Sequence, residues 1–363
     1  MKILQFITEL TPAGAERIVC ELSRNLAEQG NNVLVLSLMP LPENESILDE
    51  LRSSQIQVQS LNVTKITPLR ICGIRKVIRE FKPEIIHAHL IHPNIISRVA
   101  KIANPLKFRL VNTVHIAERR RGKWWHFILD RITFSLCDCQ TAVSKAVRDF
   151  HSAKIAKTPD QMPVIYNGVT EPKTLSKQAR EKLRSEWGVA GCSKVIGSVG
   201  RLDWQKGYDL LLNQLPEISA TIPDGENWGV VILGEGGQRA ELENIAKSLN
   251  LKNIDIILPG FRKDAADSIG AFDLFVMPSR YEGFGLTLVE AMGHGIPILA
   301  SSADSLPELM EYYSNGKCID FSETSELCNE ITRYIDKDFI HVPDQLFSID
   351  QMVKQYLKVY MKR

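Results

Sequence analysis

Two cations, Arg201 and Lys206, follow a short apolar run and are of the types that bind a diphosphate. They stand in the segment VGRLDWQKG, which comes directly after the run Val195–Val199. An arginine can donate two parallel hydrogen bonds to phosphate oxygens and a lysine adds a point charge, so the pair could stabilise negative charge on a departing diphosphate. On the spacing alone, a solvated pair that caps a helix is an equally good interpretation.

Two carboxylates, Glu282 and Glu290, lie eight residues apart in the segment SRYEGFGLTLVEAM. The glycines at 283 and 285 open backbone N–H groups just before a predicted helix. If the segment were helical throughout, the carboxylates would be about 12 Å apart, more than the roughly 5 to 9.5 Å between the acid and base of a glycosidase. We therefore expect them to contact different parts of one extended ligand. Glu290 could merely face solvent, but a carboxylate flanked by apolar residues normally needs a partner.

The first half of the chain holds weaker candidates. Gly14 lies in the strand-to-helix turn TPAGAER, where backbone N–H groups could approach an oxygen-rich ligand. A purely structural turn is at least as good an interpretation, because no GxGxxG motif is present. His115 ends the run LVNTVH and by itself is better interpreted as a satisfied core histidine. His87, His89 and His92 could be metal ligands, but no acidic or thiol partner is near in sequence, so we expect a polar edge of a cleft.

Short runs rich in Ile, Val and Leu alternate with amphipathic stretches of helical length. This alternation predicts parallel, doubly wound sheets. Strands are expected at 3–7, 33–38, 84–88, 109–115, 139–143 and 163–166, and then at 195–199, 230–233, 254–258, 274–277, 296–299 and 318–320.

A polar stretch after Gly168 separates the two series of strands and is expected to be the linker. The domains are then an N-terminal Rossmann-like domain over 1–170, a C-terminal Rossmann-like domain over 171–345, and a last helix over 346–363 that packs back toward the first domain. Ligands bind beyond the carboxyl ends of parallel strands, so we expect the two sheets to face a central cleft.

The segments AGAER, THIAER, VIYNGV, GRLDWQKG, LGEGG and EGFGLTLVEAM together resemble glycosyltransferase family 4, a group of retaining enzymes with the two-domain GT-B fold. The resemblance extends over most of the chain. It implies an acceptor-side N-terminal domain and a C-terminal domain that binds a nucleotide-sugar. Enzymes of this family generally lack a metal-binding Asp-x-Asp motif, and the one such motif here, Asp336-Lys337-Asp338, lies late in the chain. No metal or cofactor is therefore expected.

The same resemblance implies roles for single residues. The residues implied to be catalytic are His115, Glu282, Arg201 and Lys206. The histidine and the glutamate would lie near the transferred sugar, and the two cations would bind the diphosphate. Glu290 corresponds to a residue that hydrogen-bonds the nucleotide ribose. The other implied donor-binding positions are Gly14, Phe284, Gly285, Leu286 and Arg262, the last at a position whose main chain often contacts the base.

Basic residues are concentrated in the first half of the chain. Residues 1–170 carry 23 Lys and Arg against 15 Asp and Glu, whereas the rest carries 21 against 28. The expected membrane-contact residues are Arg119, Arg120, Arg121, Lys123, Trp124 and Trp125, which precede an amphipathic run. Cations beside aromatics are typical of a membrane interface, although a solvated helix face is nearly as good an interpretation. Since no nucleic-acid recognition module is present and no run could span a membrane, we expect a cytoplasmic protein, peripheral at the inner face of the plasma membrane.

The main hypothesis is a transferase that moves a sugar, preferably from a UDP-sugar, to a lipid-linked glycan in surface polysaccharide biosynthesis, such as that of lipopolysaccharide. A sugar-nucleotide epimerase of GT-B fold is an alternative, against which the spacing of Glu282 and Glu290 argues. A non-catalytic partner subunit of a glycosyltransferase is a second alternative. Only Ala13, which replaces the first glycine of the family's common Gly-Gly pair, favours it, since its methyl group narrows the allowed backbone conformations.

Overall fold

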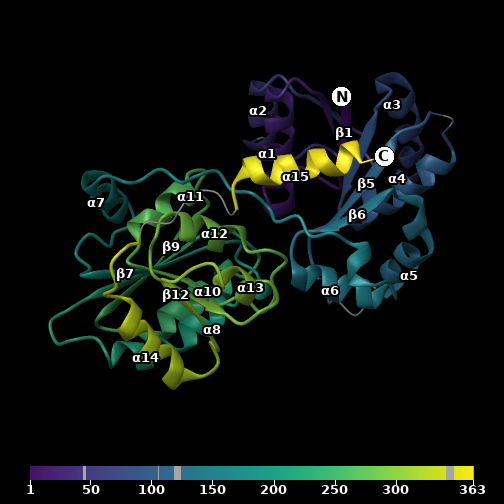
Figure 1. The fold of residues 1–363 in the computed structure, drawn as a ribbon. Helices are drawn as coiled ribbons and strands as arrows, with labels where there is room; N and C mark the ends of the chain where they lie inside the picture. The colour runs from purple at the N-terminus through teal and green to yellow at the C-terminus, as the bar shows by residue number, and fades with distance from the viewer. Residues whose placement is uncertain (44–45, 105, 118–123, 341–346, 363) are drawn as a thin grey trace. The chain divides into compact units, whose positions relative to one another are not determined.

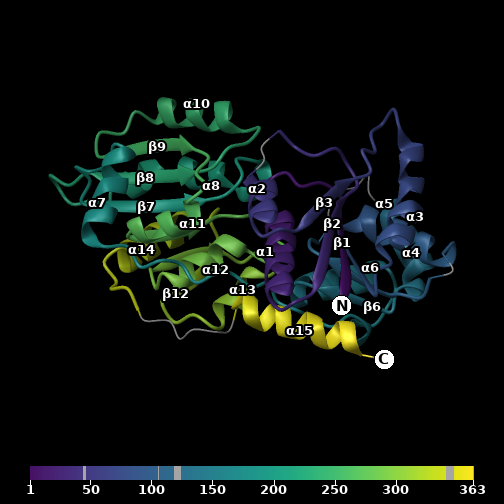
Figure 2. The same cartoon turned by 90° about the horizontal axis from the view of Figure 1, so that it is seen from above.

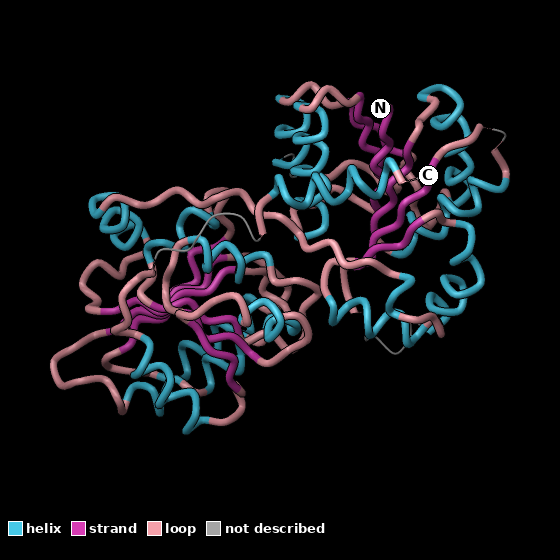
Figure 3. Tube along the Cα trace, viewed as in Figure 1, coloured by secondary structure: helices cyan, strands magenta, loops and turns pink. Residues whose placement is uncertain are grey.

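The computed structural model describes residues 1–43, 46–104, 106–117, 124–340 and 347–362. The chain forms two compact units, Met1–Gly168 with Gln345–Arg363, and Val169–Asp344. Each unit has one parallel sheet of six described strands with helices on both faces (Figure 1). Figure 3 shows this layering in each unit, with strands in magenta and helices in cyan. The expected α/β class with two Rossmann-like units is confirmed.

The N-terminal sheet has the strand order β3-β2-β1-β4-β5-β6. Its strands are β1 (Lys2–Ile7), β2 (Asn32–Ser37), β3 (Gln57–Ser60), β4 (Ile85–His89), β5 (Arg109–Val114) and β6 (Cys139–Ala142). The order reverses between β1 and β4. At such a switch point the loops after neighbouring strands leave in opposite directions, and the crevice between them is where ligands bind in open parallel sheets.

Helices cover both faces of this sheet. On one face lie α1 (Gly14–Glu28), α2 (Ser46–Ser53) and α15 (Ile349–Met361), and on the other lie α3 (Ile74–Phe81), α4 (Ile91–Ile102) and α5 (Trp124–Thr133) (Figure 2). After β6 comes α6 (Lys145–Lys154), and short 3-10 turns are η1 (Pro68–Gly73), η3 (Phe134–Leu136) and η4 (Pro159–Gln161). Although α15 is the end of the chain, it packs against α1 and β5. Its buried side chains recur at helical spacing, at Ile349, Met352, Val353, Tyr356 and Tyr360.

The C-terminal sheet has the strand order β12-β11-β10-β7-β8-β9, which reverses between β10 and β7. Its strands are β7 (Lys194–Val199), β8 (Trp228–Leu233), β9 (Ile254–Gly260), β10 (Leu274–Met277), β11 (Ile298–Ser301) and β12 (Gly316–Ile319). One face packs on α8 (Tyr208–Asn213), α9 (Leu215–Ser219), α10 (Arg239–Leu249) and α14 (Thr324–Tyr334). The remaining elements are α7 (Lys177–Glu186), α11 (Ala265–Ser268), α12 (Leu286–Gly293), α13 (Leu306–Met310), η5 (Trp204–Lys206) and η6 (Ile269–Ala271).

Two details of the N-terminal sheet differ from the expectation. The segment 163–166 is not a strand, because it makes only a single bridge, between Val164 and Ala142, and begins at a proline that has no N–H to donate. Conversely, β3 is an edge strand that the sequence pattern did not predict. Its four residues, QVQS, include a single apolar side chain, and exposed and partly buried side chains alternate along it, as suits an edge strand.

Candidate active site

The loops after β7 and β10 meet at the switch point of the C-terminal sheet, where they form a partly buried ion pair. Lys206 Nζ lies 2.7 Å from Glu282 Oε2, and the two side chains are only 16% and 12% exposed. Gly207 follows with φ +67°, and a Cβ atom there would lie 2.1 Å from the carbonyl oxygen of Pro278. Only glycine permits this approach of the two loops. The structure therefore brings together the lysine and the first glutamate that the sequence singled out.

The loop that connects β11 to α13 holds the Glu282 loop in place. The Asp304 carboxylate accepts a hydrogen bond from the backbone N–H of Glu282 at 3.0 Å. Ser305 Oγ donates to the carbonyl oxygen of Phe284 at 3.1 Å. Ser279 Oγ also donates, at 3.5 Å, to the same carboxylate oxygen that contacts Lys206. The Glu282 side chain is thus oriented by its own backbone and by a neighbouring loop.

The helix α12 begins at Leu286, four residues after Glu282, so the segment is not helical throughout and the separation of about 12 Å does not apply. Gly285 is its N-cap with φ +89°, and the amides of the first helical turn have no acceptor within the helix. Phe284, the residue before Gly285, is buried. Glu290 lies on α12 and is only 2% exposed, so the interpretation that it faces solvent is wrong.

The two arginines predicted to bind the donor, Arg201 and Arg262, do not take part in the Lys206–Glu282 ion pair, and each contacts other carboxylates. Arg201 is 60% exposed, and its Nε donates to Asp203 at 2.6 Å. Arg262 follows the edge strand β9, and its guanidinium contacts Asp264 at 2.9 Å and Glu186 at 3.0 Å. The hydrogen bond to Asp264 and the contact with Glu186 raise the pKa of Arg262 despite its partial burial. The Arg262 side chain is therefore held at that edge of the sheet by two carboxylates. The contact with the donor that the resemblance implies is one made by its main chain.

Sequence reasoning missed a third cation beside this site. Arg280 makes two hydrogen bonds to the Asp209 carboxylate, at 2.7 and 2.6 Å. Its guanidinium also lies over the Trp204 ring, 4.7 Å from the centroid. These contacts fix η5, which carries Lys206, to the loop that carries Glu282. The position of Arg280 directly inside the segment SRYEGFG was the available signal.

The N-terminal unit places His115 directly after β5, where it meets a second histidine. His115 Nε2 lies 3.0 Å from Nδ1 of His89, the last residue of β4. His89 Nε2 in turn lies 2.8 Å from Oε1 of Gln5, in the middle of β1. Burial lowers the pKa of His115 to about 4. It lowers the pKa of His89 well below its usual value, with further contributions from His87 and His115. Both rings are therefore neutral at pH 7.

The expectation that His87 and His89 line a polar edge is wrong, because both side chains are fully buried. His87 lies between Tyr360 Oη of α15 and Thr113 Oγ1 of β5, each at 2.7 Å. Its ring nitrogens are thus occupied by hydroxyl groups. Within the described residues, no three His, Cys, Asp or Glu side chains are grouped as metal ligands would be.

Gly14 is the first residue of α1, exposed at the carboxyl end of the N-terminal sheet. Ala13 before it is the N-cap, with the ordinary extended angles φ −149° and ψ 178°. Any residue adopts this conformation, so Ala13 itself needs no glycine. The Ala13 methyl group narrows the allowed backbone conformations, but the conformation found here is among those allowed, so it causes no strain.

The face formed by α4 and α5 carries exposed apolar side chains. Trp124 is 64% and Trp125 39% exposed at the start of α5, while Arg119, Arg120, Arg121 and Lys123 lie outside the described residues. Further along, Ile132 on α5 and Ile102 on the neighbouring α4 are 68% and 69% exposed. None of the helices in the described ranges has the length and apolar character that crossing a membrane takes.

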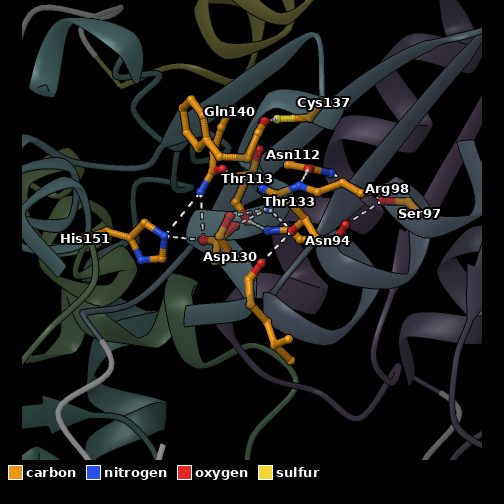
Figure 4. A network of polar contacts seen from close by, with 12 residues as sticks. Asn94, Ser97, Arg98, Asn112, Thr113, Asp130, Thr133, Cys137, Gln140 and His151 are labelled. Atoms are coloured by element: carbon orange, nitrogen blue, oxygen red, sulfur yellow. Dashed lines mark hydrogen bonds and ion pairs between the residues drawn. The ribbon is translucent and has the colours of Figure 1, made fainter. Parts of the chain in front are cut away.

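A buried charged network ties α5 to the sheet beneath it (Figure 4). Arg98 of α4 is fully buried and contacts the Asp130 carboxylate of α5. Arg98 also donates to Asn112 Oδ1 at 2.7 Å and to Gln140 Oε1 at 2.5 Å. Burial alone would raise the pKa of Asp130, but its hydrogen bond with His151 and the Arg98 charge outweigh this and lower the pKa to about 2. Sequence reasoning missed this network.

Two family models match the chain. Residues 12–171 match the model described as Glycosyltransferase Family 4, and residues 179–345 match Glycosyl transferases group 1. Together they extend over most of both units and include the segments from AGAER to EGFGLTLVEAM on which the sequence resemblance rests. The chain belongs to the GT-B glycosyltransferases of group 1, as the sequence motifs indicated.

Individual relatives agree with this family. The uncharacterized glycosyltransferase MJ1607 of Methanocaldococcus jannaschii is 28% identical over 87% of this chain and 84% of its own length. The O-antigen biosynthesis glycosyltransferase WclY of Escherichia coli is 24% identical over 91% of this chain and 94% of its own. Among solved structures, HepE of Anabaena in complex with UDP and glucose superposes with a TM-score of 0.82 at 22% identity over 99% of each chain. This structural likeness confirms the GT-B fold.

Proposed function

We propose that this glycosyltransferase is a retaining enzyme that takes its sugar from a UDP-sugar and needs no metal ion or cofactor. The observation that carries the proposal is the partly buried contact of Lys206 with Glu282 at the switch point of the C-terminal sheet. A UDP-sugar is favoured because the HepE structure, of the same fold, holds UDP and glucose.

The charges around this contact suit a diphosphate. Lys206 and the exposed Arg201 are cations after the same strand, and the start of α12 adds the partial positive charge of a helix N-terminus. In the proposal the two cations bind the diphosphate and stabilise the charge that grows on departing UDP. Glu282, displaced from Lys206, then accepts hydrogen bonds from hydroxyl groups of the transferred sugar, while Glu290 binds the ribose. Protein cations take the part that a divalent metal plays in other transferases.

Retention follows if the acceptor attacks from the face that UDP leaves. The bond between the anomeric carbon and the phosphate oxygen breaks, and a bond to the acceptor oxygen forms. The acceptor hydroxyl gives its proton to the phosphate oxygen of the departing UDP, so no protein base is needed. His115, neutral at pH 7, contributes a hydrogen bond to a hydroxyl group of the sugar.

We also propose that the acceptor is a lipid-linked glycan and that the protein works at the inner face of the membrane in surface polysaccharide biosynthesis. The exposed Trp124 and Trp125 support this, because tryptophan side chains favour the membrane–water boundary. The basic excess of residues 1–170 suits anionic lipids. The name of the E. coli relative, an O-antigen biosynthesis glycosyltransferase, points the same way.

The stereochemistry of slow donor hydrolysis tests the retaining mechanism without knowledge of the acceptor. The purified protein, in EDTA, is incubated with UDP-glucose, UDP-galactose and UDP-N-acetylglucosamine, all α-linked, and the first sugar released is followed by proton NMR before it mutarotates. We expect the α-anomer from one donor. A β-anomer would contradict retention, conversion of one UDP-sugar into another would favour the epimerase, and no turnover even with added glycan acceptors would favour the non-catalytic subunit.

A further inference from the structure

One set of buried polar side chains in the N-terminal unit forms a continuous chain of hydrogen bonds that ends at His115. Gln5 stands at its centre, fully buried in β1. Its Oε1 faces His89 at 2.8 Å, and its Nε2 donates to Tyr360 Oη at 3.5 Å. A polar side chain so deep in a sheet is retained only where its hydrogen bonds are made.

The direction of each hydrogen bond follows from Gln5. An amide oxygen only accepts, so His89 Nε2 must carry a proton. A neutral imidazole has one N–H, which leaves His89 Nδ1 as an acceptor. Its partner at 3.0 Å, His115 Nε2, must therefore donate. The remaining nitrogen of His115, Nδ1, is then unprotonated and has no hydrogen-bond partner among the described residues.

The other half of the chain is consistent with this direction. Tyr360 Oη accepts from Gln5, so its own proton goes to His87 Nδ1 at 2.7 Å. His87 Nε2 then donates to Thr113 Oγ1 at 2.7 Å, and Thr113 can donate to Thr141 Oγ1 at 2.8 Å. With these directions, every contact in the sequence pairs one hydrogen-bond donor with one acceptor. The direction imposed by Gln5 therefore satisfies the buried chain as a whole.

The backbone beside His89 is held in an unusual conformation. Leu90, the next residue, has φ +70° and ψ 164°, a region that only glycine adopts without strain. The residue lies at the switch point between β1 and β4. Strain of this kind persists where the surrounding structure imposes it, and here it directs the chain from His89 into α4.

We propose that Gln5 and His89 are positioning residues that hold His115 as its Nε2–H tautomer, so that Nδ1 accepts a hydrogen bond from a sugar hydroxyl group. Tyr360 of α15 anchors the Gln5 amide in the orientation that this requires. The inference rests on the proposed function for the role of His115, but the tautomer itself is a property of the resting protein.

The test is NMR of protein carrying 13C- and 15N-labelled histidine, without donor, with the His115 signals assigned through His115→Gln. Ring nitrogen and Cδ2 shifts distinguish the two tautomers. We expect Nε2–H in the wild type, a mixture in Gln5→Met, and a shift toward a mixture in Tyr360→Phe. Tyr356→Phe is the matched control, because its hydroxyl lies one helical turn away and contacts Thr113, at 3.3 Å, and not Gln5. It should retain the wild-type tautomer.

Turnover of the UDP-sugar gives a second readout. Gln5→Met should lower kcat by about five- to tenfold, the factor that one neutral hydrogen bond supplies, and leave KM for the donor within about twofold. An Nδ1–H tautomer in the wild type, or an unchanged His115 spectrum in Gln5→Met, would overturn the inference even if the enzyme turns over. Absence of turnover with the expected spectra would instead count against the proposed function alone.

Discussion

Charged side chains that are removed from water decide much of the chemistry of this molecule. Lys206 and Glu282 have 16% and 12% of their side chains exposed, so each needs the other or a charged ligand in its place. Lys317 makes comparable contacts with Glu326 and Glu330 at 3.1 and 3.0 Å, but it is 39% exposed on the edge strand β12. A Lys–Glu pair by itself does not indicate a functional site. Its burial and its position at the switch point of a sheet distinguish a functional candidate from a surface contact.

Asp130 offers a prediction about acid stability. Its folded-state pKa of about 2 lies below the roughly 3.9 of an unfolded aspartate, so the carboxylate contributes stability above about pH 4 that is lost as the pH falls toward 2. We expect Asp130→Asn to cost about 3 kcal/mol at pH 7, and the difference from wild type to shrink below pH 4. Thermal melts across this pH range measure both effects.

Asp149→Asn is the control for this series. Asp149 is 55% exposed in its contact with Arg148, so its replacement should change the stability by no more than about 0.5 kcal/mol. Equal melting temperatures of the two variants at pH 7 would show that the Arg98 network does not stabilise the unit.

At the scale of elements, α5 combines a buried anchor with an exposed apolar face. Asp130 fixes it to Arg98 from within, while Trp124, Trp125, Ile128 and Ile132 are exposed. A helix held rigidly by one face can present the other to a membrane surface without ordering cost at the moment of contact. This is the element from which membrane association is most directly tested.

Cosedimentation with vesicles is the appropriate measurement for α5. The double variant Trp124→Ser, Trp125→Ser should bind vesicles that contain phosphatidylglycerol at least about tenfold more weakly. The reason is that burying the apolar surface of each tryptophan contributes roughly 1 kcal/mol or more to the binding free energy. Tyr312→Ser, at a position 47% exposed in the C-terminal unit, should bind as the wild type does. Equal binding of all three proteins, or none by the wild type, would refute membrane contact through α5.

Most elements could be predicted from the sequence because their strands are short apolar runs buried on both faces. The edge strand β3 could not, since Gln57–Ser60 has only four residues and a single apolar side chain among them. The site divides in the same way. Glu282 and Lys206 stand in segments with a recognisable pattern, whereas the partners that hold them, such as Asp304 and Arg280, come from other loops, and a single sequence does not show which loops meet.

The buried networks of the N-terminal unit illustrate this limit further. Gln5 was a visible signal, a polar residue inside the apolar run of β1, but its partners His89 and Tyr360 are 84 and 355 residues away. Arg98 likewise has no distinguishing feature in the sequence of α4. Its partners lie on α5 and β6, which only the folded structure brings next to it. Tertiary packing, and not local pattern, makes these side chains functional or structural.

At the scale of the whole molecule, two similar sheets carry different chemistry. Both are parallel and both reverse their strand order once, between β1 and β4 and between β10 and β7. The first switch point gathers neutral, buried histidines beside β1, and the second gathers cations and carboxylates. The halves of the sequence also differ in charge, with an excess of bases before residue 171 and of acids after it.

The central claim is that the Lys206–Glu282 contact marks the site for the donor diphosphate. Calorimetric titration of UDP in EDTA, with the wild type, Lys206→Met and Lys317→Met, tests it most directly, because methionine keeps the apolar stem of each lysine and removes only its charge. We predict that UDP binds the wild type and Lys317→Met alike, and Lys206→Met at least about tenfold more weakly, a loss of roughly 1.4 kcal/mol. Unchanged UDP binding by a folded Lys206→Met would contradict the claim.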